Sequence, residues 1–445
     1  MTEGSITKKL ITFAIPLFVG QLLQQLYNVV DSVVVGNVLG KEALAAVSTA
    51  GSLIFLMVGF ITGLFMGGGV IIGKRYGAKD FEGVSTATHT GITFALIMGV
   101  ALTVVGFFAT PVILGWMGTP DNVMPSSVLY FRIYFLGGLG NVMYNACCGV
   151  FQAVGDSKHP LYYLIVSTVI NTVLDILFVK FLGFGIGGAA AATIIAQFVS
   201  ALLAFIRLTR VDGPHRIYIR KLKIDRETLS KELKIGFPTG IQNSVIAIGN
   251  VVVQSNINSF GDVAMAGCGS YFKLEGFVFL PITCMSMALT TFVSQNLGAG
   301  QYDRVKKGAR IGSIISVSCA ELIGVLVFLL APILLRMFSN EAEVIAVGIR
   351  QARTESLFYC LLALNHCLAG ILRGAGKTKV PMIVMLSSWC LLRITYITII
   401  VRIIPVVNVI FWAYPLTWSA SAIVFLIYYF KADWIHNFAK GGERA

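Results

Sequence analysis

The 445-residue chain is 56% hydrophobic and only 12% charged, and its net charge is +13. Soluble globular chains average about 25% charged residues, so this composition excludes an ordinary soluble domain and indicates a polytopic membrane protein. The positive charge does not indicate nucleic-acid binding, because most of the 34 Lys and Arg residues lie in the short segments that connect apolar runs.

The apolar runs are each long enough to cross a bilayer, which takes about 20 residues. They predict twelve spans, near residues 10–36, 43–72, 88–109, 127–152, 160–180, 187–208, 233–259, 266–295, 309–335, 352–373, 380–402 and 407–430. The basic residues gather on the side that holds both termini, which the positive-inside rule assigns to the cytoplasm. We therefore expect an all-α, multi-pass protein of the cytoplasmic (inner) membrane with cytoplasmic termini. The first run is too long for a cleaved signal sequence.

The two sets of six spans repeat one another. At a constant separation, Gly40 aligns with Gly261, Gly77 with Gly298, Pro111 with Pro332, Arg132 with Arg353 and Gly155 with Gly376. A shared register over more than a hundred residues indicates an internal repeat. Because each repeat has an even number of spans, both enter from the same side and are related by an axis along the membrane normal.

A basic segment, Thr209–Lys234, separates the repeats, and Asp225 is placed to cap a helix that follows it. We expect a first lobe over residues 1–208, a cytoplasmic linker over 209–232 and a second lobe over 233–445. Two turns, GVFQAVGDSKHP and GILRGAGKTKVP, are typical of tight helical hairpins. Gly59, Gly63 and Gly67 are spaced for close helix packing.

The first span carries a polar face made of Gln21, Gln24, Asn28 and Asp31, which are three or four residues apart. Amides on such a face can join helices by hydrogen bonds. A carboxylate at membrane depth is costly, however, and marks a functional site by default. We therefore interpret Asp31 as functional.

A second carboxylate in the first lobe is accompanied by neutral oxygen donors. Asp175 shares a helix face with Asn171, and Asn145 and Thr193 lie on neighbouring spans. Together with Asp31 these residues suit either of two tasks: they can ligate a hard cation such as Na⁺, or they can share a proton, because two nearby carboxylates resist ionising together. We expect a cation-coupling site made of Asp31, Asn145, Asn171, Asp175 and Thr193.

The second lobe lacks this chemistry, because Val253 stands where Asp31 would project. We expect a substrate path lined by Gln24, Asn28, Asn250, Gln254, Glu275 and His366. Lys273 is a candidate partner for Glu275. We interpret Glu355 as one half of a headgroup-level ion pair with Arg353.

No motif favours catalysis. The stretch Gly68–Lys74 has the spacing of a phosphate-binding loop, but Arg75 replaces the required Ser or Thr and the segment ends a membrane span. The eight cysteines show no metal-ligand spacing and are expected to be reduced packing residues. We expect no enzymatic activity and no cofactor apart from a coupling H⁺ or Na⁺.

The chain resembles the multidrug and toxic compound extrusion (MATE) transporters over nearly its whole length. The resemblance lies in the two six-span repeats, the basic linker, and the sequences VVDSVVVGNVLG, RYGAKD and GVFQAVGD. It implies two pseudo-symmetric six-helix lobes in a V-shaped arrangement, and it assigns Asp31, Asn145, Asn171, Asp175 and Thr193 to the cation site of the first lobe. Some branches of this family rely instead on acidic residues in the seventh and tenth spans. In the present chain the seventh span carries amides.

These observations predict an antiporter that exports amphiphilic, often cationic, organic compounds in exchange for H⁺ or Na⁺. The alternative is a flippase for a lipid-linked saccharide, which would need basic residues in the cavity, and only Arg132, Lys273 and Arg393 are embedded. The expected partners are small organic molecules and the lipid bilayer, and not nucleic acid. We expect the monomer to be the functional form.

Overall fold

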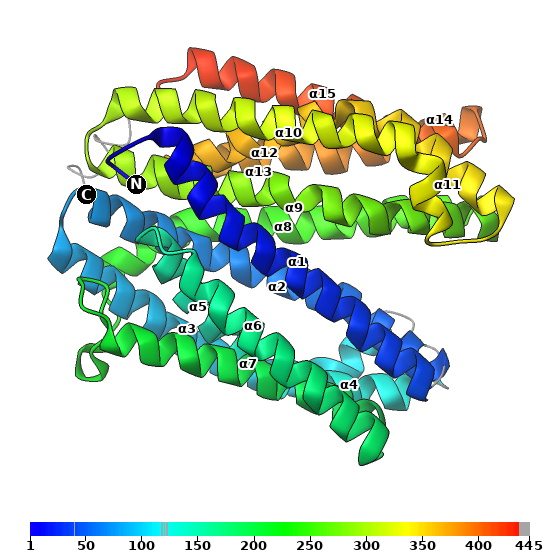
Figure 1. The fold of residues 1–445 in the computed structure, drawn as a ribbon, viewed down its shortest axis with the longest axis horizontal. Helices are drawn as coiled ribbons and strands as arrows, with labels where there is room; N and C mark the ends of the chain where they lie inside the picture. The colour runs from blue at the N-terminus through cyan, green and yellow to red at the C-terminus, as the bar shows by residue number, and fades with distance from the viewer. Residues whose placement is uncertain (40, 117–118, 120, 122, 436–445) are drawn as a thin grey trace. The chain divides into compact units, whose positions relative to one another are not determined.

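The computed structural model describes residues 1–39, 41–116, 119, 121 and 123–435, and of residues 29–39, 41–53 and 55 it describes the backbone alone. All the secondary-structure elements of the described chain are helices (Figure 1). This confirms the all-α class predicted from the apolar runs.

The first half of the chain contains seven α-helices and one π-helix in the described residues. They are α1 (Ile6–Leu39), α2 (Lys41–Gly77), α3 (Phe81–Trp116), α4 (Met124–Leu136), α5 (Gly138–Ala153), α6 (Lys158–Asp175), η1 (Ile176–Phe181) and α7 (Gly185–Arg210). A short 3₁₀ turn, η2 (Ile219–Lys221), lies in the segment that leads to the second half.

The second half begins with a helix whose first turns lie in the predicted linker. Its elements are α8 (Arg226–Asn258), α9 (Asp262–Gly298), α10 (Tyr302–Arg336), α11 (Ala342–Glu355), η3 (Ser356–Phe358), α12 (Tyr359–Gly374), α13 (Lys379–Met385), η4 (Leu386–Leu392), α14 (Arg393–Ile403) and α15 (Asn408–Lys431).

Ten helical segments in the described chain are long and apolar enough to cross a membrane. Two of the twelve predicted spans are not among them. The fourth span is divided at Gly137 into α4 and α5, each too short to cross alone. The seventh span is α8, whose charged first turns and later amides lower its mean hydropathy. Both departures follow from local sequence, and neither removes a helix from the predicted order.

The chain forms two compact units. The N-unit is Pro16–Gly236, and the C-unit combines Met1–Ile15 with Phe237–Ala445. The chain therefore passes from one unit to the other within α1, beside Pro16, and within α8, beside Pro238. The predicted lobe boundaries at residues 208 and 233 stay predictions.

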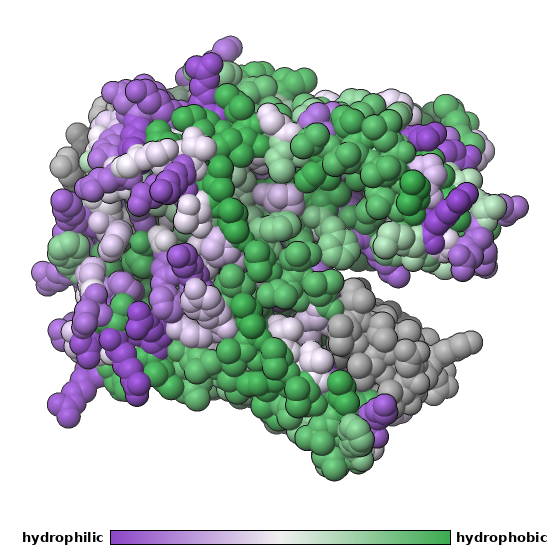
Figure 2. All heavy atoms as spheres, in the orientation of Figure 1, coloured by the Kyte–Doolittle hydropathy of each residue, from purple (hydrophilic) through white to green (hydrophobic). Residues whose placement is uncertain are grey.

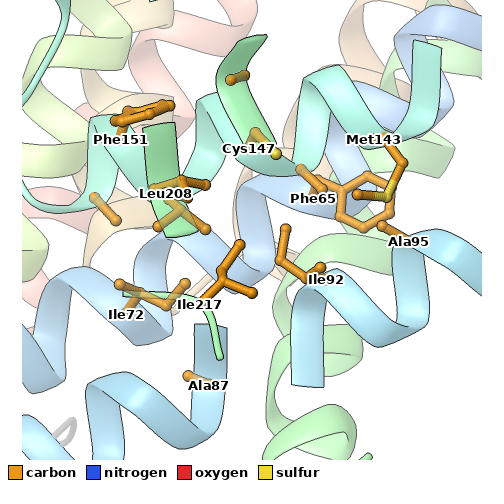
Figure 3. Packing of buried hydrophobic residues seen from close by; sticks show 14 of the residues in the cluster. Phe65, Ile72, Ala87, Ile92, Ala95, Met143, Cys147, Phe151, Leu208 and Ile217 are labelled. Atoms are coloured by element: carbon orange, nitrogen blue, oxygen red, sulfur yellow. The ribbon is translucent and has the colours of Figure 1, made fainter. Parts of the chain in front are cut away.

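The interior of the N-unit is packed by apolar side chains from α2, α3, α5 and α7 (Figure 3). Phe65, Ile92, Cys147 and Leu208 are among its members, and Ile217 of the linker, 2% exposed, packs into the same cluster. Apolar burial of this kind contributes about 25 cal/mol per Å². It fixes the linker to the end of the N-unit where α2 ends and α3 begins.

The linker is also attached by hydrogen bonds. The backbone N–H of Tyr218 donates to His89 Nε2 at 3.0 Å, and the backbone N–H of Asp225 donates to Thr90 Oγ1 at 3.1 Å. Asp225 Oδ1 accepts a hydrogen bond from the backbone N–H of Thr228 at 2.8 Å, which confirms the predicted cap. In the N-unit, Figure 2 shows hydrophilic side chains gathered where α7 ends, and hydrophobic side chains along the flank of α7.

The two predicted hairpin turns are present. Gly155 and Gly376 lie at equivalent positions of the repeats and adopt φ of 92° and 73°, a conformation that glycine reaches without strain. The helices that follow start at Lys158 and Lys379, each two residues before a proline. The structure thus confirms the repeat at the level of single turns.

Candidate coupling and substrate sites

Asp175 and Asn171 lie one turn apart on α6, and both are buried, 1% and 2% exposed. A π-helix, η1, begins directly after Asp175. Single π turns are rare and occur often at functional sites, because they change the direction of the side chains around them. The periodicity analysis did not predict it.

Thr193 on α7 is adjacent to this pair. Asn171 Nδ2 donates to Thr193 Oγ1 at 3.4 Å, and Tyr27 Oη lies 3.1 Å from the same hydroxyl. Thr193 Oγ1 donates in turn to the carbonyl of Ala189 at 3.1 Å. The structure therefore brings α1, α6 and α7 of the N-unit together through one threonine.

Asn171 Oδ1 has no hydrogen-bond partner in the part of the chain that the structure describes. Buried amide oxygens normally have one. The buried carboxyl group of Asp175 lies one turn away. The oxygen atoms of these two side chains are therefore shielded from solvent, and oxygen ligands of this kind suit a proton or a hard cation.

The other two predicted members of the cation-coupling site are Asp31 and Asn145. Asp31 lies in the last part of α1, and its side chain is outside the described residues. Asn145 on α5 accepts a hydrogen bond from Thr62 Oγ1 at 3.2 Å and donates to the carbonyl of Asn141 at 2.9 Å. The described hydrogen bonds of Asn145 thus join α5 to α2.

The predicted substrate-path residues are exposed or half-buried on their own units, apart from Glu275. Gln24 and Asn28 are exposed on the N-unit and Asn250 on the C-unit, whereas Gln254 donates to Asn258 Oδ1 at 2.8 Å. His366 is half-buried between the rings of Phe279 and Trp389, whose centroids lie 5.2 Å and 5.6 Å away. Glu275 is 9% exposed.

A second polar cluster lies inside the C-unit, and the sequence interpretation of it was wrong. Glu355 is fully buried and accepts hydrogen bonds from Tyr271 Oη at 3.2 Å and Gln351 Nε2 at 2.9 Å. Arg353 is exposed, and its guanidinium lies over the ring of Phe328. Residues two apart on a helix point to different faces, so the headgroup-level pair does not form.

Glu275 does not pair with Lys273 for the same reason, and no salt bridge joins them in the described structure. Glu275 instead interacts electrostatically with Arg393, which also interacts with Glu355. Arg393 donates to Thr417 Oγ1 at 2.9 Å and lies 4.3 Å from the ring centroid of Tyr414. Two acids and one arginine are thus held in a single buried network.

The signal for this network was present in the sequence. Tyr271 and Glu275 are four residues apart on α9, and Gln351 and Glu355 are four apart on α11, so each pair shares a face. Spacing alone did not show that α9 and α11 pack together, which is what joins the two pairs.

A family model described as MatE matches the chain twice, over residues 16–177 and 238–399. The two matches confirm the internal repeat, and each starts at a proline, Pro16 or Pro238, beside which the chain changes unit.

Two Bacillus subtilis proteins are similar along most of the chain. "Probable multidrug resistance protein YoeA" is 31% identical, covering 87% of this chain and 85% of its own length. "Probable multidrug resistance protein YpnP" is 30% identical and covers 88% of each chain. Among solved structures, one described as the outward-facing conformation of a multidrug resistance MATE family transporter has a TM-score of 0.91 at 23% identity, covering 98% of this chain and 97% of its own.

Proposed function

Because the chain belongs to the multidrug and toxic compound extrusion family of membrane transporters, we propose that it is a cation-coupled antiporter. In this proposal H⁺ or Na⁺ enters from outside onto Asp31 and Asp175, and an amphiphilic, often cationic, organic compound leaves the cell. The observation that carries the proposal is the buried cluster of Asp175, Asn171 and Thr193.

The physical reason is the cost of a carboxylate at membrane depth, which is several kcal/mol unless the group is neutralised. A proton or Na⁺ on Asp175 removes that cost. Neutral oxygens are supplied by Asn171, one turn away on α6, and by Thr193, which is hydrogen-bonded to Asn171. A bound ion shifts the equilibrium between two conformations of the protein only if it binds one conformation more tightly than the other. The cluster joins α1, α6 and α7, so an ion bound there favours one arrangement of these helices.

The proposed substrate path is lined in the N-unit by Gln24 and Asn28. In the C-unit it is lined by Asn250, Gln254, Glu275 and His366. Exposed amides in helices that cross a bilayer need water or a polar partner. A path that carries an amphiphilic substrate supplies both. We further propose that both termini are cytoplasmic and that the monomer transports.

The flippase alternative is not favoured. Its diphosphate would need basic residues in the cavity. Of the three embedded cations, Arg393 donates to Thr417, Arg132 lies over the ring of Phe107, and Lys273 is the one that is exposed. The deciding experiment is transport of a cationic dye into or out of proteoliposomes, with a pH gradient or a Na⁺ gradient imposed in turn. Export that follows one of the two gradients supports the antiporter; export that follows neither contradicts it.

A further inference from the structure

A fourth buried acid lies outside both polar clusters. Glu232 is on α8, before the predicted seventh span and one turn before Gly236, where the chain leaves the N-unit. It is 4% exposed. Its neighbours belong to the end of the N-unit that carries the basic linker, so it is at the opposite end from the predicted position of Asp175.

The carboxyl group of Glu232 borders a small cavity whose polar wall it forms. Glycines from three helices face it, namely Gly68 and Gly69 of α2, Gly91 of α3 and Gly149 of α5. The remaining wall is apolar, and the cavity measures about 20 Å³. A space of this size accommodates one water molecule.

The glycines create this space. A Cβ on Gly91 would lie 3.7 Å from Glu232 Oε2, and a Cβ on Gly68 would lie 3.6 Å from Glu232 Cδ. Both are ordinary van der Waals distances, so alanine would fit at either position and would fill the cavity. Glycine at both positions leaves the carboxyl group with room for a solvent molecule.

Glu232 Oε1 has no hydrogen-bond partner among the described residues. A buried carboxylate with an unsatisfied oxygen is strongly disfavoured, whereas the neutral acid needs fewer partners. The geometry therefore favours the protonated form.

The α2 cation that acts on Glu232, Arg75, has its hydrogen bonds elsewhere. Arg75 donates to a backbone carbonyl at the start of α3 at 2.8 Å and to Thr228 Oγ1 at 3.2 Å, and so attracts a Glu232 charge only at a distance. Lys74, beside Arg75, is repelled by the charges of Arg75 and Lys231. Of the two, Arg75 is the cation that acts on Glu232.

The groups on α8 and before it do not compensate. Lys231 pairs with Glu227 on the exposed side of the helix. Asp225, in the turn before α8, is negative and opposes ionisation of Glu232. The charges that act on the carboxyl group of Glu232 are those of Arg75 and Asp225, and neither residue lies on α8.

The facing residues of α3 and α5 are uncharged. His89 Nε2 accepts a backbone N–H from the linker, and its Nδ1 lies 2.7 Å from a carbonyl of its own helix, which together fix the neutral tautomer. The ionisable side chains of α5 are the phenol of Tyr144 and the thiols of Cys147 and Cys148. Burial therefore dominates and raises the pKa of Glu232 from 4.5 to about 8.

We propose that Glu232 and one water molecule in the glycine-lined cavity form a proton-binding site at the cytoplasmic end of the N-unit, occupied while the first turns of α8 are packed against α2 and α3. The site is distinct from Asp31 and Asp175 and does not depend on which compound is transported. Because the packing of α8 excludes solvent from the carboxyl group, separation of α8 from α2 would release the proton.

The test is infrared difference spectroscopy of the purified protein as its pH is raised. We expect the C=O stretch of a protonated carboxyl group to disappear with a midpoint at about pH 8, and this component to be absent from Glu232→Gln and retained in Asp175→Asn. In Gly91→Ala, which fills the cavity, the midpoint should move to higher pH, because the carboxylate loses the water that would solvate it. This variant keeps the acid, so it tests the proposal even if Glu232→Gln folds poorly.

Three outcomes would overturn the proposal. The first is an unchanged difference spectrum in Glu232→Gln. The second is an unchanged midpoint in Gly91→Ala. The third is a wild-type midpoint that falls as Na⁺ is added, which would make the cavity a metal-cation site instead of a proton site.

Discussion

Tyr271 Oη donates a hydrogen bond to Glu355 Oε2 at 3.2 Å and thereby joins α9 to α11 inside the C-unit. The same hydroxyl lies 2.8 Å from Tyr359 Oη. Both tyrosines are fully buried. One hydroxyl therefore satisfies two polar groups that have no access to water.

Replacing Tyr271 by phenylalanine should destabilise the protein by about 1–3 kcal/mol, because it leaves a buried carboxyl group and a buried phenol each short of a partner. The measurement is thermal unfolding in detergent. Tyr162→Phe is the matched control: Tyr162 is 53% exposed, and its loss should change stability by less than about 0.5 kcal/mol. Equal effects of the two substitutions would contradict the assigned network.

Gly67 permits backbone contact between α2 and α8, since a Cβ there would lie 2.2 Å from the carbonyl oxygen of Glu232. Gly67→Ala should therefore force the helices apart at a cost of about 1–3 kcal/mol or more. Gly269→Ala on α9 is the control, because its Cβ meets nothing within 4 Å and alanine favours a helix by up to about 1 kcal/mol. Unfolding temperatures should move in opposite directions in the two variants.

Lys223 is exposed in the linker, and a cysteine placed there should react with a membrane-impermeant maleimide only from the cytoplasmic side. The reason is the excess of Lys and Arg in this segment. Glu341→Cys, in the exposed turn between α10 and α11, should react only from outside. The measurement is the labelling of each cysteine variant, above that of the unsubstituted protein, in intact cells and in inverted vesicles. The reverse labelling pattern would show that the protein has the opposite orientation in the membrane.

The stability of the protein should fall as pH rises through the range in which Glu232 ionises. Its pKa is raised in the folded state, from 4.5 to about 8, so its stabilising effect is complete below 4.5 and is lost by about pH 8. Glu232→Gln should remove this part of the pH dependence. An identical pH profile of the unfolding temperature in both proteins would show that the folded state does not raise this pKa.

Much of the fold follows from sequence patterns that act locally. Hydropathy located the spans, the repeat predicted equivalent turns at Gly155 and Gly376, and a single aspartate, Asp225, marked the start of α8. These features depend on residues within a few positions of one another. They also explain why the phosphate-loop spacing at Gly68 was correctly rejected, since that glycine lies inside α2.

The sites were harder to predict, because they depend on which helices touch. The spacing of Asn171 and Asp175 was sufficient to pair them, but the contribution of Tyr27 requires α1 to pack beside Thr193. The prediction that Glu355 pairs with Arg353 at the membrane surface was wrong. It was based on the position of Glu355 near a helix end, whereas in the structure Tyr271 of α9 donates a hydrogen bond to Glu355. The π turn after Asp175 has no signature in the hydrophobic pattern.

The central claim is that the first-half carboxylates couple ion entry to export. The direct measurement is gradient-driven export of a cationic dye by proteoliposomes containing Asp31→Asn, Asp175→Asn or, as control, Asp212→Asn, whose side chain is fully exposed in the linker. An amide keeps the volume of the carboxyl group but cannot exchange a proton and is a poorer cation ligand, so both Asp31→Asn and Asp175→Asn should lose export while remaining folded and inserted, and Asp212→Asn should transport normally. Normal export by Asp31→Asn and Asp175→Asn under both a pH gradient and a Na⁺ gradient would contradict the account.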